Sequence, residues 1–121
     1  MEMLFPHERL EAYRVAREFR VLAHDVERRL PRGDLREQIE RASRSILFNT
    51  AEGAGRKHGR DKAKYYGYAK ASAEECAAIL DDLAICGVVS AERLAPGRGL
   101  LLSAVRLLAG LIRSALRRGE A

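Results

Sequence analysis

The stretch from Gln38 to Arg56 constrains the fold more than any other part of this sequence. At about 100° per residue, its apolar residues Ile39, Ala42 and Ile46 fall on one side of a helix. Polar residues follow one flank of that apolar side, and they are Arg41, Ser45, Asn49 and Glu52. The stretch therefore predicts an amphipathic helix that buries one stripe and carries a polar strip beside it.

Two glycines follow this pattern. Gly53 and Gly55 tolerate positive φ, so we expect the helix to end near Glu52 in a glycine C-cap, where the chain turns. Nothing between Gln38 and Arg56 is a catalytic signature.

Three more helical patterns occupy the rest of the chain. Pro6 opens the first, Asp34 is an acidic N-cap candidate for the helix just described, and Ser90 can cap the last. The expected helices cover residues 7–30, 34–52, 60–86 and 91–118. Short turns join them, which predicts an all-α fold, an up-and-down antiparallel four-helix bundle that forms a single domain over residues 1–121.

The third expected helix, 60–86, should be the longest. We expect the fourth to become regular only from about Leu100, because Pro96, Gly97 and Gly99 interrupt its first turns.

Composition agrees with a folded helical protein. Apolar residues make up 47% and charged residues 32% of 121 residues, which suits one soluble globular domain. We find no apolar segment close to the roughly 20 residues of a membrane span and no basic N-terminal leader, so we expect a cytoplasmic protein. Cys76 and Cys86 lie ten residues apart in one expected helix and cannot pair, so we expect buried free thiols.

Enzymatic readings find little support. His7, His24 and His58 stand in different segments without cysteine or carboxylate partners at metal-ligand spacing. Glu74 and Glu75 are adjacent in a helix, so their side chains diverge and cannot act as a carboxylate pair. We therefore expect no catalysis, no cofactor and no metal site.

Several motifs carry a resemblance to a known family. Gln38, Arg41-Ala42, Ser45-Ile46 and Asn49-Thr50-Ala51-Glu52-Gly53 match its second-helix pattern at the same spacing, and Ala69–Glu75 is similar to its third-helix segment. The chain resembles, over nearly its whole length, the small bacterial four-helix-bundle proteins encoded by intervening sequences in large-subunit ribosomal RNA genes. Thr50, Ala71 and Tyr13 depart from the usual Ile, Gly and Trp, which are changes on the scale of packing.

The resemblance implies properties that the residues alone do not give. Family members are described as homopentamers, so it implies a homo-oligomer of five chains. A related group, the accessory proteins of diversity-generating retroelements, binds nucleic acid and a reverse transcriptase, which implies similar partners as a hypothesis.

The fourth helix has more apolar surface than the stripe of about 100° that a bundle helix needs. It is either deeply buried in a small core or part of a subunit interface, and we favour the interface. On that reading, Leu101 and Leu108 are expected on its outward side.

All of the net charge lies in one segment. Residues 1–52 and 71–121 each sum to zero, whereas residues 53–70 carry the whole +5. The six cations of this segment, which we call the basic rim, are Arg56, Lys57, Arg60, Lys62, Lys64 and Lys70, with Tyr65, Tyr66 and Tyr68 interleaved. A basic loop beside aromatic rings suits phosphate contacts with some base stacking, although lysines around a helix start are often only a solvated face.

Arginines at the end of the fourth helix have a different explanation. Arg113, Arg117 and Arg118 favour the helix dipole, so we expect them to matter less for binding.

The polar strip gives a structural expectation. We call Arg41, Ser45, Asn49, Glu52, Ser72 and Glu75 the seam, and expect a buried or half-buried network in which Arg41 pairs with Glu75.

Together these patterns predict a non-enzymatic homo-oligomeric bundle that binds nucleic acid, structured RNA in particular, through the basic rim. The alternative is a protein-interaction scaffold, such as an accessory subunit of a reverse transcriptase, in which the same rim docks an acidic protein.

Overall fold

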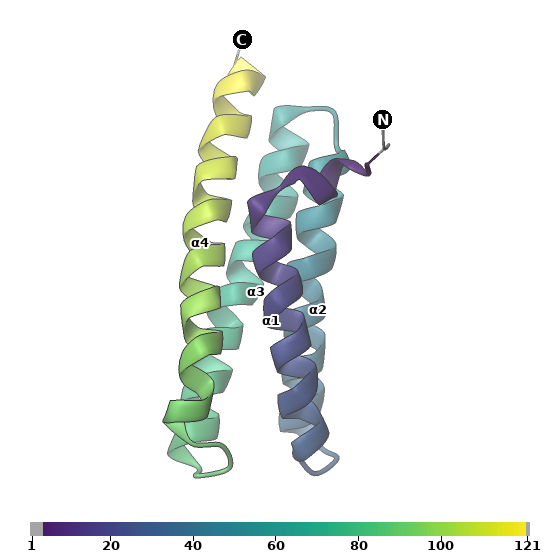
Figure 1. Cartoon of the computed structure of the whole chain (residues 1–121). Coiled ribbons are helices and arrows are strands. Elements are labelled where there is room, and N and C mark those ends of the chain that lie inside the picture. The colour runs from purple at the N-terminus through teal and green to yellow at the C-terminus, as the bar shows by residue number, and fades with distance from the viewer. Residues whose placement is uncertain (1–3, 121) are drawn as a thin grey trace.

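A computed structural model describes residues 4–120 of the chain and contains four α-helices in that range (Figure 1). The elements are a short 3-10 helix η1 (Pro6–Arg9), α1 (Glu11–Arg29), α2 (Asp34–Gly55), α3 (Gly59–Ile85) and α4 (Ala91–Glu120). Successive helices run in opposite directions, and contacts between α1 and α4 close the bundle. The predicted all-α four-helix bundle is confirmed.

The core lies along the shared axis of the four helices. Its largest fully buried side chains include Phe19 of α1, Ile39 and Ile46 of α2, and Leu83 of α3. The apolar side that the sequence predicts for α2 is therefore the one that faces the core. Burial of these side chains supplies most of the driving force for folding.

The first helix differs from the expected range 7–30. A 3-10 turn forms at Pro6–Arg9, where the Glu8 carboxylate accepts a hydrogen bond from the Phe5 backbone N–H at 2.8 Å. Leu10 is then extended, with φ −91° and ψ 129°, and α1 starts at Glu11. The extended residue separates the two helical segments.

The glycine C-cap expected at the end of α2 is wrong. Both Gly53 and Gly55 are helical, and α2 continues to Gly55 instead of ending near Glu52. A Cβ on Gly53 would lie 2.7 Å from two ring carbons of Tyr66, so this glycine allows α3 to approach α2 closely. The left-handed turn glycine is Gly87, with φ 69°, after α3.

The beginning of α4 also differs from expectation. The helix is continuous from Ala91, with Pro96 inside it, and its 30 residues exceed the 27 of α3. The Arg93 backbone N–H donates to the Ser90 hydroxyl at 3.2 Å, which confirms the predicted cap. Because Gly97 faces α1, where its Cβ would lie 3.0 Å from Leu22 Cδ2, it serves close packing and does not break the helix.

Leu101 and Leu108 are core residues, not outward-facing ones. Their exposed fractions are 2% and 0%, and Ala104 lies between them on the same inner line of α4. The outward apolar residues are instead Leu102 and Leu116, which are 50% and 43% exposed. The expected excess of apolar surface on α4 is therefore present, but on other residues.

By length and composition alone, α4 could cross a membrane, and it is the one such helix in residues 4–120. Charged residues interrupt the apolar runs of this helix, so no uninterrupted apolar segment indicates a span, although a span can include a few charges. Part of this composition is explained by burial of Leu101 and Leu108 in the bundle, yet only 22% of the apolar window is buried. Leu107, Leu111 and Ile112 are partly buried against the core, whereas Leu102 and Leu116 remain exposed.

Candidate nucleic-acid interface

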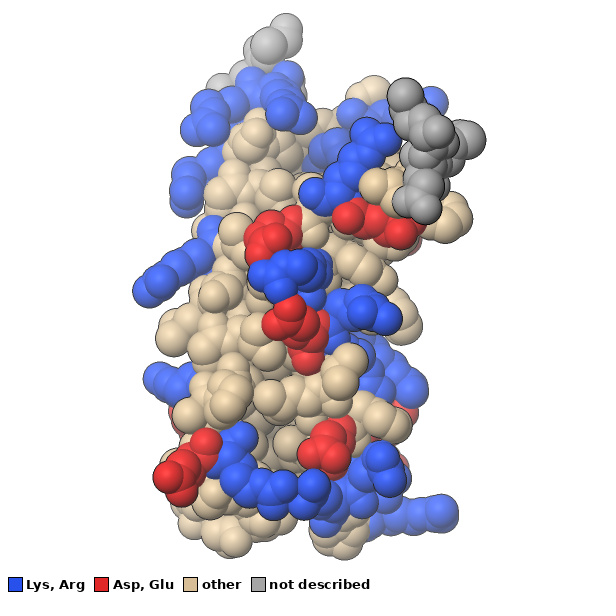
Figure 2. Space-filling model, in the orientation of Figure 1, with Lys and Arg blue, Asp and Glu red and all other residues tan. Residues whose placement is uncertain are grey.

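The α2–α3 turn lies at the end of the bundle where both chain termini are also found (Figure 1). This turn places the first five cations of the basic rim between the end of α2 and the first turns of α3. Figure 2 shows Lys and Arg side chains at this end of the molecule, which we call the basic end. Lys and Arg side chains also lie at the opposite end, where Asp and Glu side chains stand beside them.

The basic end contains a cavity of about 430 Å³, which we call the rim cavity. Its lining residues are Lys57, His58, Gly59, Arg60 and Arg118. Lys57, Arg60 and Arg118 are exposed, and none of them forms an ion pair with a side chain that the structure describes. Three cations thus converge on one cavity, and none has an acidic partner among the described side chains.

Arg118 therefore belongs with the basic rim in space. We assigned it from sequence to the helix dipole, but α4 brings it to the α2–α3 turn. It also lines a second cavity with Arg9 and Lys62, and its charge helps to lower the pKa of Lys62. No local sequence signal connects residues 57–60 with residue 118, because the contact depends on how helices pack.

Lys62 has a structural role within the rim. Its ammonium group donates hydrogen bonds to the carbonyl oxygens of Ala54 at 2.9 Å and Gly53 at 3.2 Å. These carbonyls belong to the last turn of α2, where a cation interacts favourably with the helix dipole. Burial and then the nearby Arg118 charge lower the pKa of Lys62. The Lys62 ammonium group is thus occupied by hydrogen bonds to the end of α2.

Arg56 and Lys64 gather around one aromatic ring. The Arg56 guanidinium lies 4.5 Å and the Lys64 ammonium 4.9 Å from the centre of the Tyr65 ring. Arg56 also donates to the Tyr65 hydroxyl at 3.0 Å and pairs with Glu52 at 2.9 Å. Cation–π contacts hold both positive groups beside Tyr65.

Lys70 contributes less to the surface charge than expected. It lies farther along α3, where its ammonium pairs with the Glu74 carboxylate at 3.4 Å. Its charge is therefore balanced locally.

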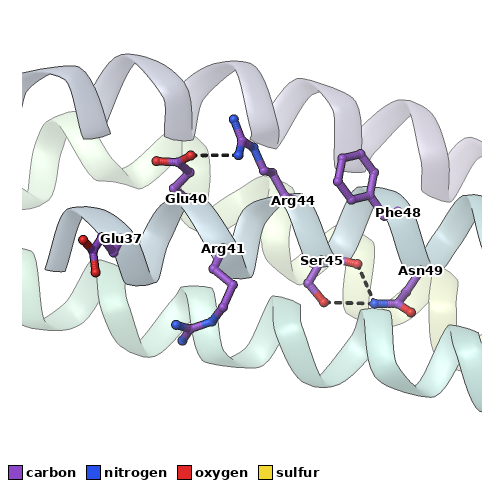
Figure 3. Close-up of a pocket in the computed structure, with 7 residues that line it drawn as sticks. All are labelled: Glu37, Glu40, Arg41, Arg44, Ser45, Phe48 and Asn49. Atoms are coloured by element: carbon purple, nitrogen blue, oxygen red, sulfur yellow. Dashed lines mark hydrogen bonds and ion pairs between the residues drawn. The ribbon is translucent and has the colours of Figure 1, made fainter. Parts of the chain in front are cut away.

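The seam forms a hydrogen-bonded contact between α2 and α3. The hydroxyls of Ser45 and Ser72 are 2.7 Å apart, and the Asn49 side-chain amide donates to the Ser45 carbonyl and hydroxyl at 3.0 and 2.9 Å (Figure 3). The predicted pair of Arg41 and Glu75 is present at 3.4 Å.

That pair is not buried, contrary to our expectation. The Arg41 and Glu75 side chains are 68% and 48% exposed, because both extend outward from the helix contact. An exposed pair of this kind stabilises a protein little. Glu52, which we also assigned to the seam, forms an ion pair with Arg56 instead.

A buried ion pair exists elsewhere, and the sequence analysis missed it. Arg20 donates to both carboxylate oxygens of Glu27 at 3.2 Å and to the Ser43 hydroxyl at 3.3 Å, while His24 contacts Glu27 at 3.1 Å. Burial raises the pKa of Glu27, but the hydrogen bonds from Arg20 and His24 outweigh it and leave the pKa below 4.5. The spacing of seven residues between Arg20 and Glu27 was the available signal, since it places both on one helix face.

The outer side of α2 carries a shallow groove of about 550 Å³. Glu37, Glu40, Arg41 and Arg44 line it, and Glu40 pairs with Arg44 at 2.8 Å (Figure 3). Its charges are thus of both signs, unlike those of the rim cavity.

The remaining chemistry-bearing groups do not assemble into a site. Cys76 is buried, which raises its pKa to about 12, whereas Cys86 is exposed, contrary to expectation, because it follows the last residue of α3. Among the residues that the structure describes, no group of three His, Cys, Asp or Glu side chains could hold a metal ion.

Comparison with known proteins gives one match. The sequence model of a family described as 23S rRNA-intervening sequence protein matches residues 8–110. No curated protein and no solved structure matches the chain.

Proposed function

This chain belongs to the 23S rRNA-intervening sequence protein family, and on that premise we propose that it is a non-enzymatic protein that binds RNA at the basic end of the bundle. The family description names an intervening sequence of 23S rRNA, which is compatible with a nucleic-acid association. The residues that would bind RNA are fewer than the six cations of the basic rim, and they include one residue from outside it. They are Lys57, Arg60, Lys64 and Arg118, with Arg56 held nearby by Glu52 and Tyr65.

The rim cavity carries this proposal. Lys57, Arg60 and Arg118 are exposed, converge from two elements and lack acidic partners among the described side chains. Unbalanced cations that surround a cavity attract phosphate groups, and RNA gains affinity when counterions are released from its backbone. Arg60 lies in the first turn of α3, where the helix dipole adds to the attraction for an anion.

We also propose that the chain forms a homo-oligomer through α4. Leu102 and Leu116 are exposed, and Val105 and Ile112 on the same side of α4 are half-buried, so this side offers an apolar surface. A second copy of the chain could cover it, and the family resemblance suggests a ring of five. A ring would repeat the rim cavity around one edge and strengthen a weak contact by avidity.

The assembly is tested by sedimentation of wild type and of a Leu102→Glu, Leu116→Glu double variant. We expect smaller particles with unchanged helical circular dichroism, because both side chains are exposed in one chain. A wild type that sediments as a monomer at high micromolar concentration would exclude this interface.

The RNA proposal is tested by charge neutralisation at the two ends of the bundle. The first variant combines Lys57→Gln, Arg60→Gln and Arg118→Gln, and its matched control combines Arg28→Gln, Arg32→Gln and Arg93→Gln. We expect the first to lose about 100-fold in RNA affinity at low salt, and the salt dependence to weaken by about three counterions. The control should bind nearly as wild type does.

Two outcomes would reject the proposal. One is a wild type with no affinity for RNA or DNA in filter binding at low salt, and the other is an equal loss in both triple variants. In the first case the scaffold reading takes its place, and the rim cavity would instead dock an acidic protein.

A further inference from the structure

Three tyrosines near the start of α3 have three different surroundings. Tyr66 is 3% exposed and packs against Gly53. Tyr65 is half-buried beneath the cations of Arg56 and Lys64. Tyr68 is 52% exposed and carries no cation–π contact among the described residues. Of these three tyrosines, only Tyr68 offers a large, open aromatic surface next to the basic end.

The position of Tyr68 is fixed by its neighbour. Its ring packs edge to face with that of Tyr65, with centroids 5.8 Å apart and an interplanar angle of 86°. Tyr65 is in turn held by Arg56, which donates to its hydroxyl at 3.0 Å. The Tyr68 ring is thus connected through Tyr65 to Arg56. Because this contact already restricts the ring, Tyr68 loses little additional conformational entropy when it binds a ligand.

About half of the Tyr68 side chain, 52%, is open to solvent. One helical turn farther along α3, the neighbouring residues on the same face are Ala71 and Ser72. Ala71 is small and exposed, and the Ser72 hydroxyl is occupied with Ser45. No bulky side chain of α3 therefore follows Tyr68 on this face, which leaves room for a planar group against the ring.

We propose that Tyr68 is a stacking platform for an unpaired base of the RNA whose phosphates bind at the rim cavity. This inference rests on the proposed function and narrows its substrate class to RNA with unpaired nucleotides. Bases within an A-form duplex are covered on both faces by their neighbours, so only a loop, bulge or single strand can present a free face to a side chain. Arg56 and Lys64 lie beside Tyr65, whose ring contacts that of Tyr68. The phosphate of a nucleotide can therefore contact these cations while its base stacks on Tyr68.

The test compares Tyr68→Ala and Tyr68→Phe with the control Phe48→Ala. Phe48 is also an exposed aromatic, at 62%, but it lies in the mixed-charge groove of α2 (Figure 3). The probes are a short unstructured RNA and a blunt duplex of the same sequence. We expect Tyr68→Ala to weaken binding of the single strand about 10-fold and to leave duplex binding unchanged. Tyr68→Phe and Phe48→Ala should both bind as wild type does.

Tyrosine fluorescence gives a second readout that does not depend on affinity. The chain has four tyrosines and no tryptophan, so stacking of a base on one ring is directly visible as quenching. Saturation with the single strand should quench the wild type, whereas Tyr68→Phe should bind equally well and show markedly less quenching. A purely structural role for Tyr68 would not separate quenching from affinity in this way.

The outcomes distinguish this inference from the proposed function. Equal affinity of wild type for both probes, or a Tyr68→Ala variant that binds the single strand as wild type does, would overturn the stacking platform while RNA binding stands. Equal quenching in wild type and Tyr68→Phe would overturn it as well. A wild type that binds neither probe would overturn both.

Discussion

The two ends of this bundle differ in what they do with charge. At the basic end, residues 56–64 carry five cations and one aspartate. At the opposite end, the two turn regions 28–37 and 81–93 together carry five cations and five carboxylates. Both ends close the same core, so folding does not require an excess of cations. The excess of cations at the basic end is therefore not needed to close the core, and the proposed RNA contact rests on it.

The contrast continues inside the bundle. Toward the opposite end, the buried carboxylate of Glu27 forms an ion pair with Arg20, and this pair contributes to the fold. Toward the basic end, close packing of Gly53 on Tyr66 and the Lys62 hydrogen bonds hold α2 and α3 together. If the ends are functionally different, changes in one half should alter stability alone, and changes in the other should alter binding as well.

The largest effect is expected from Glu27→Ala. The Glu27 side chain is 5% exposed and Arg20 is 14% exposed, so the variant strands a charge in the protein interior. We expect a loss of about 3 kcal/mol in the free energy of unfolding. Urea denaturation measures it, and RNA affinity of the folded variant should stay unchanged because the pair lies away from the rim cavity.

The pH dependence of unfolding provides the control. Because the pKa of Glu27 is lower in the folded protein, its contribution is complete above about pH 4.5 and is lost as the pH falls through the folded pKa. Glu27→Ala should lack this component of acid destabilisation. A double variant, Arg20→Met with Glu27→Leu, should recover most of the stability, and failure to do so would show that the pair itself is favourable.

A smaller effect, but on both properties, is expected from Gly53→Ala. The new Cβ would meet the Tyr66 ring at 2.7 Å, and the backbone carbonyl of Lys62 at 3.3 Å limits how far α3 can yield. We expect a loss of about 2 kcal/mol from overpacking, measured by thermal unfolding. Because the α2–α3 turn must shift, RNA affinity should also fall. Gly55→Ala is the matched control, since nothing lies within 4 Å of its Cβ position.

The smallest effect is expected from Lys62→Met. The variant removes two hydrogen bonds to the last carbonyls of α2, which should cost about 1 kcal/mol in the free energy of unfolding. Its RNA affinity should fall less than that of Arg60→Gln, because the Lys62 ammonium is occupied inside the bundle end. A larger loss of RNA affinity in Lys62→Met than in Arg60→Gln would show that Lys62 belongs to the RNA-binding surface.

Sequence patterns were sufficient where the physics is local. Helical periodicity relates residues three and four apart, so the core stripe of Ile39 and Ile46, the four helices and the bundle could all be predicted. The concentration of charge in residues 53–70 is likewise a property of the chain itself. The pairing of Arg41 with Glu75 was predicted from the polar flank of α2 and from the family resemblance of the Glu75 segment, although its exposure was not.

The tertiary structure decided what depends on contacts between distant segments. Gly53 appeared to be a cap, but the closeness of Tyr66 gives it a packing role. Lys62 and Arg118 exchanged their expected roles, because helix crossing places one against the end of α2 and the other at the rim cavity. Periodicity gives the direction of a side chain around its own helix, but only the packing of all four helices determines which groups it meets.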